Sequence, residues 1–149
     1  MLSCKERGRE LCARRNGQNV TIRQLTIADY DSVVRIWEQA GLPYKPKGRE
    51  SKEAIAKQIR ETPDLLLGAE IGGKLIGVIV GSTEGRKGWL NRIAVVPEQR
   101  GKGIARLMIH EGESALRKRG IRIIALLIEK SNFISIKLAK CLGYIPADD

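Results

Sequence analysis

The amino-acid sequence predicts an α+β domain that becomes α/β in its second half. In the first half, the dipeptide Gly72-Gly73 separates two apolar runs, which is the signal of an antiparallel hairpin. In the second half, an apolar strand, a long amphipathic helix and another apolar strand follow one another as a β-α-β unit. The length of 149 residues fits one domain with its own core.

The first half carries the signals of three strands and two helices. Thr26 is a suitable N-cap for the first helix, and Ser51 for the second. Residues 42–50 between the helices contain two prolines and predict a loop. The predicted elements are strands over residues 20–25, 65–71 and 74–82, a helix that reaches residue 40 and a short helix that reaches about residue 61.

The second half predicts two strands that alternate with two helices. Pro97 closes the first of these strands, and Gly120 and Gly143 stand where helices end. From Tyr144 we expect another extended segment. The predicted elements are strands over residues 89–96 and 121–128, a helix over about 103–119 and a helix over about 131–142.

Composition excludes several classes of protein. No apolar run approaches the ~20 residues of a membrane span, and the start lacks the apolar region of a secretory signal. The odd number of cysteines (Cys4, Cys12 and Cys141) predicts free thiols in a reducing, cytoplasmic compartment. A single histidine, His110, excludes multi-histidine metal sites, and we expect no metal.

Charge leaves the class of partner open. The net charge of +10 suits nucleic acid or phosphorylated ligands, and equally a solubilising shell without a specific partner. Residues 1–19 are polar and basic without apolar periodicity, and we expect a flexible extension before a domain over residues 20–149.

The most informative segment is a Gly-rich loop between a strand and a helix. Backbone N–H groups at a helix start lack intrahelical partners and attract anions. Gly101 and Gly103 allow close approach of phosphate oxygens, and Arg100, Lys102 and Arg106 add positive charge. The segment does not match a P-loop or a dinucleotide fingerprint, because the glycines that these motifs need are missing.

The segment resembles the pyrophosphate motif [RQ]-x-x-G-x-[GA] of the GNAT superfamily of N-acetyltransferases, matched by Arg100-Gly101-Lys102-Gly103-Ile104-Ala105. A second family motif, N-x-x-A-I-x-L-Y-E-K-L-G-F, is approached by residues 132–144. The resemblance covers about residues 20–146. It implies a mixed, mostly antiparallel sheet flanked by helices on both faces.

The resemblance also implies an activity and a cofactor site. We expect direct transfer of an acetyl group from acetyl-CoA to a primary amine of a small molecule or a protein N-terminus. The N–H of Val95 is expected to polarise the thioester carbonyl. The implied cofactor-binding residues are Ile93, Ala94, Val95, Arg100, Gly101, Lys102, Gly103, Ile104, Ala105, Arg106 and Asn132.

Two departures from the family leave the catalytic residues unassigned. Ala139 stands where many members have a tyrosine that protonates the thiolate, and Asn91 stands near a common strand carboxylate. Glu84 and Glu129 are candidate bases without support from the family. The alternative hypothesis is a catalytically degenerate module that binds CoA or nucleic acid on the same fold.

The end of the chain raises a question about the sheet. The family fold has one more strand after the aromatic that matches Tyr144, and only residues up to Asp149 follow here. Either the chain is shortened, or a second chain completes the edge, which predicts a homodimer. We further expect Trp37 and Tyr30 in the core, Cys141 buried, His110 on the surface, and Tyr44 near the substrate.

Overall fold

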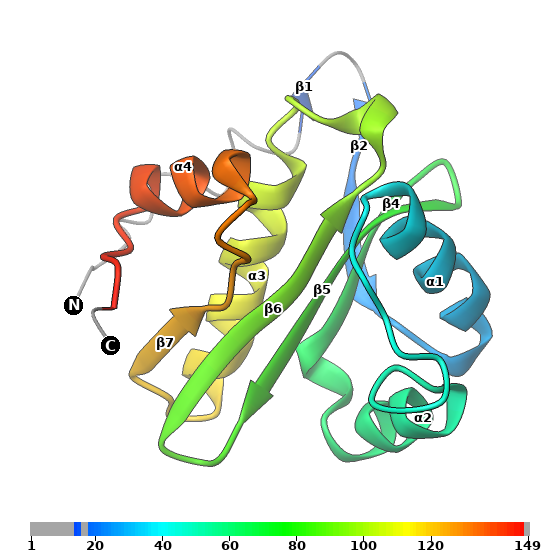
Figure 1. The fold of residues 1–149 in the computed structure, drawn as a ribbon, viewed down its shortest axis with the longest axis horizontal. Helices are drawn as coiled ribbons and strands as arrows, with labels where there is room; N and C mark the ends of the chain where they lie inside the picture. Colours follow the sequence, from blue (N-terminus) through cyan, green and yellow to red (C-terminus); the bar gives the residue numbers. More distant parts are fainter. Residues whose placement is uncertain (1–13, 16–17, 148–149) are drawn as a thin grey trace.

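The computed structural model describes residues 14–15 and 18–147, which form a mixed five-stranded sheet in the order β3-β4-β5-β6-β7 (Figure 1). Neighbouring strands are antiparallel from β3 to β6, and β7 runs parallel to β6. The strands are β3 (Thr21–Gln24), β4 (Leu66–Ile71), β5 (Lys74–Thr83), β6 (Lys87–Val95) and β7 (Ile123–Leu126). The helices are α1 (Tyr30–Gln39), α2 (Lys52–Glu61), α3 (Ile104–Lys118) and α4 (Phe133–Cys141).

This architecture confirms the α+β prediction and the mixed, mostly antiparallel sheet. No helix within residues 14–15 and 18–147 is long and apolar enough to cross a membrane. Of the predicted basic extension, the structure describes β1 (Arg14–Arg15) and β2 (Gln18–Asn19), which pair antiparallel. The rest of that extension, with Cys4 and Cys12, lies outside the described residues.

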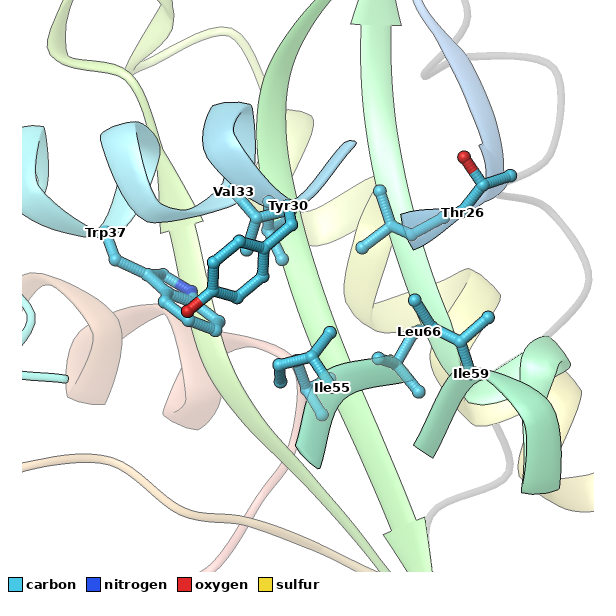
Figure 2. Close-up of a pocket in the computed structure, with 10 residues that line it drawn as sticks. Thr26, Tyr30, Val33, Trp37, Ile55, Ile59 and Leu66 are labelled. Carbon is cyan, nitrogen blue, oxygen red and sulfur yellow. The ribbon is translucent and has the colours of Figure 1, made fainter. Parts of the chain in front are cut away.

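Helices cover both faces of the sheet. A Cβ added to Gly112 of α3 would lie 2.7 Å from the Leu90 side chain, so only glycine lets α3 approach β6 this closely. On the other face, α1 and α2 direct Trp37, Ile55 and neighbouring side chains at Val78 of β5 (Figure 2). The cavity between them measures about 10 Å³ and is apolar, so it is a packing void of the core and no ligand site.

The predicted burial of single residues is confirmed in part. Trp37 is buried as predicted, and Tyr30 packs at the edge of the same core. Cys141 is exposed, which corrects the prediction of a buried thiol. The reason is helical phase, since Leu138, Ala139 and Leu142 form the packed side of α4 and Cys141 lies outside this arc.

Two predicted strands differ from the structure. The strand expected over 121–128 is β7, which has only four residues, because Ile121 donates its N–H to the Leu116 carbonyl at the end of α3 at 3.1 Å and so does not join the sheet. The extended segment expected from Tyr144 forms no strand within the described residues 142–147. Instead, the Tyr144 hydroxyl donates a hydrogen bond to the Glu113 carboxylate and ties the end of α4 to α3. The homodimer stays a prediction.

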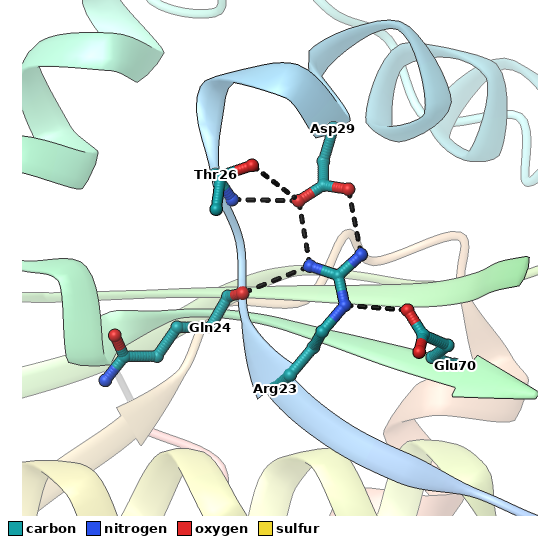
Figure 3. Close-up of polar contacts among 5 residues, drawn as sticks. All are labelled: Arg23, Gln24, Thr26, Asp29 and Glu70. Carbon is teal, nitrogen blue, oxygen red and sulfur yellow. Dashed lines mark hydrogen bonds and ion pairs between the residues drawn. The ribbon is translucent and has the colours of Figure 1, made fainter. Parts of the chain in front are cut away.

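A single guanidinium joins β3, β4 and the start of α1 (Figure 3). Arg23 Nε donates to Glu70 at 2.7 Å, and the two Nη atoms donate to both oxygens of Asp29 at 2.8 and 2.9 Å. Asp29 also accepts the Thr26 N–H at 2.8 Å, as a helix cap does. Arg23 above all, and then this backbone bond, lower the pKa of Asp29 from 3.8 to about 2.

Acid should therefore remove the contribution of Asp29 to stability. A carboxyl whose folded-state pKa is lowered stabilises the protein above its unfolded pKa, and this contribution disappears as pH falls from about 4 to about 2. Because the cluster is partly exposed, we expect Asp29→Asn to cost about 1 kcal/mol at pH 7. Urea unfolding followed by circular dichroism should show this difference vanish near pH 2. A difference that is independent of pH would contradict the assignment.

Candidate functional site

Strand β6 is paired on both sides over only part of its length. Its parallel ladder with β7 ends at Leu90, whose carbonyl accepts the Leu127 N–H at 3.0 Å. Its antiparallel ladder with β5 continues to Val95. Beyond Leu90, one edge of β6 is therefore without a neighbouring strand among the described residues. The chain after β7 turns away toward α4 (Figure 1).

The backbone of Val95 faces this unpaired edge. The next residue, Val96, donates its N–H to Ile76 of the β5 side at 2.9 Å. Successive residues of an antiparallel strand direct their backbone groups to alternate sides, so the N–H and C=O of Val95 turn away from β5. The same alternation turns Ala94 toward β5, opposite Val78. An incoming group can thus extend the sheet at Val95.

A β-bulge lies where pairing with β7 stops. Val78 and Val80 of β5 face Ala94 and Asn91, so β6 contains one extra residue between these pairs. Arg92 takes up the irregularity with a φ of 53°, the one positive φ at a non-glycine residue in the described chain. Bulges bend and twist a strand. This one separates the part of β6 that pairs with both β5 and β7 from the part that pairs with β5 alone.

The loop after β6 presents a row of backbone donors. Gly101 and Gly103 have φ of 77° and 78°, and a Cβ at either position would meet no atom within 4 Å. The first N–H of this region with an acceptor is that of Leu107, which bonds to the Gly103 carbonyl at 3.1 Å. Among the described residues, the N–H groups of 101–106 have no acceptor. A row of free N–H groups at a helix start attracts anions.

Three cations surround this row, and one of them connects the loop to β6. Arg100 donates through Nε to the Val95 carbonyl at 3.3 Å, and Lys102 donates to Gln99 at 2.9 Å. Arg106 is exposed on the first turn of α3. The side chain of Ile104 is buried in the core, so only the backbone of this residue is available to a ligand. The unpaired edge and the donor row thus form one continuous path.

Asn132 is not joined to this path by a hydrogen bond. It caps α4, where its side-chain oxygen accepts the Ser135 N–H at 3.2 Å. Its own N–H donates to the Glu129 carbonyl at 2.9 Å. The N-cap role predicted from the sequence is confirmed, and a ligand contact stays a prediction.

Within the described residues, no hydrogen bond joins a candidate acid–base residue to Val95. Glu84 lies in the turn at the other end of β6, where it accepts the Lys87 N–H at 3.3 Å. Glu129 is exposed before α4, and Ala139 is buried with 8% exposure. The side-chain oxygen of Asn91 is buried without a hydrogen-bond partner. Within the described part of the chain, no cluster of histidine, cysteine and carboxylate side chains could hold a metal ion.

The structure also reveals a polar cluster that the sequence does not indicate. Arg92 stacks over the Trp37 ring at 4.4 Å from its centroid and donates to the Pro43 carbonyl at 2.5 Å. Its Nη1 lies 3.9 Å from buried Glu50. Tyr44, the expected substrate-side aromatic, packs against Trp37 with ring centroids 6.3 Å apart. The cluster joins α1, the loop over residues 42–50 and β6, which are distant in the sequence. Apolar periodicity along the chain therefore could not predict it.

A separate groove lies at the other edge of the sheet. It has a volume of about 490 Å³ and opens between the start of α1 and the α2 region. It is remote from the donor row, because it borders β3 whereas the row follows β6. Its lining is formed by Gln24, Leu25, Thr26, Ile27, Ala56, Ile59, Arg60 and Pro63.

Comparisons with known proteins agree on one family. The sequence model of the Acetyltransferase (GNAT) family matches residues 30–144. The chain is 33% identical over 123 residues to an acetyltransferase of Photorhabdus laumondii subsp. laumondii, covering 83% of this chain and 85% of that protein.

Solved structures share the fold at lower identity. PaiA N-acetyltransferase from Thermoplasma acidophilum, in complex with coenzyme A, superposes with a TM-score of 0.77 at 23% identity over 88% of this chain and 92% of that chain. Ard1 from Thermoplasma volcanium gives a TM-score of 0.76 at 23% identity over 87% and 84% of the two chains.

Proposed function

The chain belongs to the GNAT family of acetyltransferases, and we propose that it transfers the acetyl group of acetyl-CoA to a primary amine of a small molecule or a protein N-terminus. One observation carries the proposal. The unpaired edge of β6 at Val95 leads through Arg100 directly into the row of free N–H groups over 101–106. An elongated ligand with a pyrophosphate at one end and an amide-containing arm at the other matches this path.

Each part of the path has a proposed partner on acetyl-CoA. The donor row binds the pyrophosphate, with added charge from the three cations. The edge of β6 pairs with the amides of the pantetheine arm, as an added strand would. Asn132 contributes from the start of α4. The proposed cofactor-binding residues are Ile93, Ala94, Val95, Arg100, Gly101, Lys102, Gly103, Ile104, Ala105, Arg106 and Asn132.

The proposed reaction is a direct transfer. The neutral amine nitrogen forms a bond to the thioester carbon, the carbon–sulfur bond breaks, the amine loses a proton and the thiolate takes one up. The Val95 N–H, held by β6, stabilises the charge that develops on the carbonyl oxygen. With no acid or base assigned among the side chains, positioning is the main contribution of the protein.

Gly103→Glu should abolish CoA binding. The new side chain would enter open space at the donor row and place a negative charge beside the pyrophosphate, so we expect affinity to fall at least ~100-fold. Isothermal titration with CoA measures this. Gly85→Glu is the matched control, because Gly85 also has a positive φ, 98°, and open surroundings but lies in the turn at the far end of β6. Equal affinities in both variants would exclude the donor row from the site.

Val95→Pro should lower kcat without a matching loss of CoA affinity. Proline removes one N–H, which β5 does not use, and loss of an oxyanion donor typically costs ~10²–10³ in kcat. Val95→Ala keeps the N–H while it removes most of the buried side chain, and so controls for packing. The proposed role of this N–H would be wrong if both variants lost kcat equally.

An acetyl-CoA turnover assay against amines, aminoglycosides and peptide N-termini tests the activity itself. Because only the neutral amine attacks, we expect kcat/KM for an alkylamine to rise about tenfold per pH unit below its pKa of ~10.4. The substitution of Ala139 for the family tyrosine favours an alternative, a degenerate CoA-binding module. Tight CoA binding without turnover of any acceptor would support that alternative and contradict the enzyme.

A further inference from the structure

Unpartnered buried polar atoms gather at one place in the described chain. The buried side-chain nitrogen and oxygen atoms without hydrogen-bond partners there are Trp37 Nε1, Asn91 Oδ1, and Nε and Nη2 of Arg92. Arg92 and Asn91 are consecutive, and Arg92 stacks on Trp37. A folded protein satisfies nearly all such atoms. A cluster of this kind, which contains both donors and an acceptor, points to a missing polar ligand.

The cluster lies on the sheet face that α1 and α2 cover. Asn91 stands opposite Val80, and residues opposite each other in an antiparallel pair share one face. Val80 lines the apolar cavity beneath α1 and α2. The loop of the donor row instead leads into α3, on the other face (Figure 1). Acetyl-CoA and the cluster therefore approach β6 from different sides.

The free atoms of Arg92 form a specific recognition edge. Nη1 is already used by the Pro43 carbonyl. Nε–H and Nη2–H remain, and these two parallel donors form the side-on fork that binds a carboxylate through both of its oxygens. The fork is covered in this structure, so a ligand that reaches it must displace part of the loop over residues 42–50. Pro43 and Glu50 hold that loop to Arg92.

The charge of Arg92 is incompletely balanced by the protein. Glu50, at 3.9 Å, is beyond hydrogen-bond distance and accepts the Lys45 N–H at 2.8 Å through its other oxygen. Burial is the main cause that lowers the pKa of Arg92, which reflects loss of hydration without a close counterion. The covering loop and the start of α2 add exposed cations at Lys45, Lys47, Arg49 and Lys52. This local excess of positive charge favours the binding of an anion.

We propose that Arg92 binds a carboxylate of the acceptor through Nε and Nη2, so that the acceptor is an amine carried by an acidic molecule. The proposal rests on the amine transfer proposed above and names its substrate class. Arg92 precedes Val95 by three residues on β6, which span less than the ~10 Å of a regular strand because the bulge lies between Asn91 and Ala94. That separation suits a peptide N-terminus with an acidic side chain in its first three residues.

Two tetrapeptide amides that differ only in charge, Ala-Gly-Glu-Gly and Ala-Gly-Gln-Gly, test the proposal. We expect the wild type to prefer the Glu peptide at least tenfold in kcat/KM at low salt, and the preference to fall as salt rises. Arg92→Lys, which keeps the charge but lacks the fork, should reduce the preference at least fivefold. Arg117→Lys, exposed at the end of α3, is the matched control and should retain it.

A second variant tests the proposal if Arg92→Lys fails to fold, and a binding measurement tests it if neither peptide is acetylated. Arg49 is exposed over 79% of its side chain, so Arg49→Glu should fold normally and weaken the preference two- to fivefold. Tryptophan fluorescence titration in a Trp89→Phe background, with each peptide and with CoA present, reports binding at Trp37 even without catalysis. Acetylation of both peptides within twofold of each other, or a preference that Arg92→Lys retains, would overturn the proposal. Selective binding of the Glu peptide without acetylation would support the proposed role of Arg92 in binding a carboxylate. The same result would contradict the proposed acetyl transfer.

Discussion

The unequal pairing of β6 is the constraint on which the candidate site depends. A strand in the interior of a sheet normally has all its backbone groups satisfied, because both neighbours run along its whole length. Here β7 accompanies β6 only as far as Leu90. The remainder of β6 pairs with β5 alone, and this leaves the N–H of Val95 without a partner strand, while its C=O accepts the Arg100 Nε–H.

The same strand organises both approaches to the site. At its C-terminal end, β6 continues into the glycine loop, and Arg100 folds back to the Val95 carbonyl. In its middle, the bulge at Arg92 turns a guanidinium toward α1, where Trp37 and Glu50 surround it. One face therefore presents backbone donors without acceptors, and the other presents a partly buried cation. Val95 lies between the two.

Elements distant from β6 provide rigidity. The Arg23 guanidinium clamps β3, β4 and the start of α1 at the opposite edge of the sheet, and α1 in turn supplies Trp37 beneath Arg92. Glycine at position 112 lets α3 contact Leu90 closely, which fixes the helix whose first turn carries the donor row. The network at the edge thus supports the centre of the sheet through α1, and the contact between α3 and Leu90 supports it from the other face.

The order of elements and the glycine loop could be read from the sequence, because both follow from local patterns. Apolar periodicity indicates the helices, caps at Ser51 and Asn132 mark the starts of α2 and α4, and the motif over 100–106 occupies consecutive residues. The length of β7, the exposure of Cys141 and the positive φ of Arg92 depended on the tertiary structure. Pairing between residues of β6 and β7 that are 36 positions apart, and the meeting of Trp37, Glu50 and Arg92, arise from long-range packing. No local preference encodes such contacts, so only the folded chain decides them.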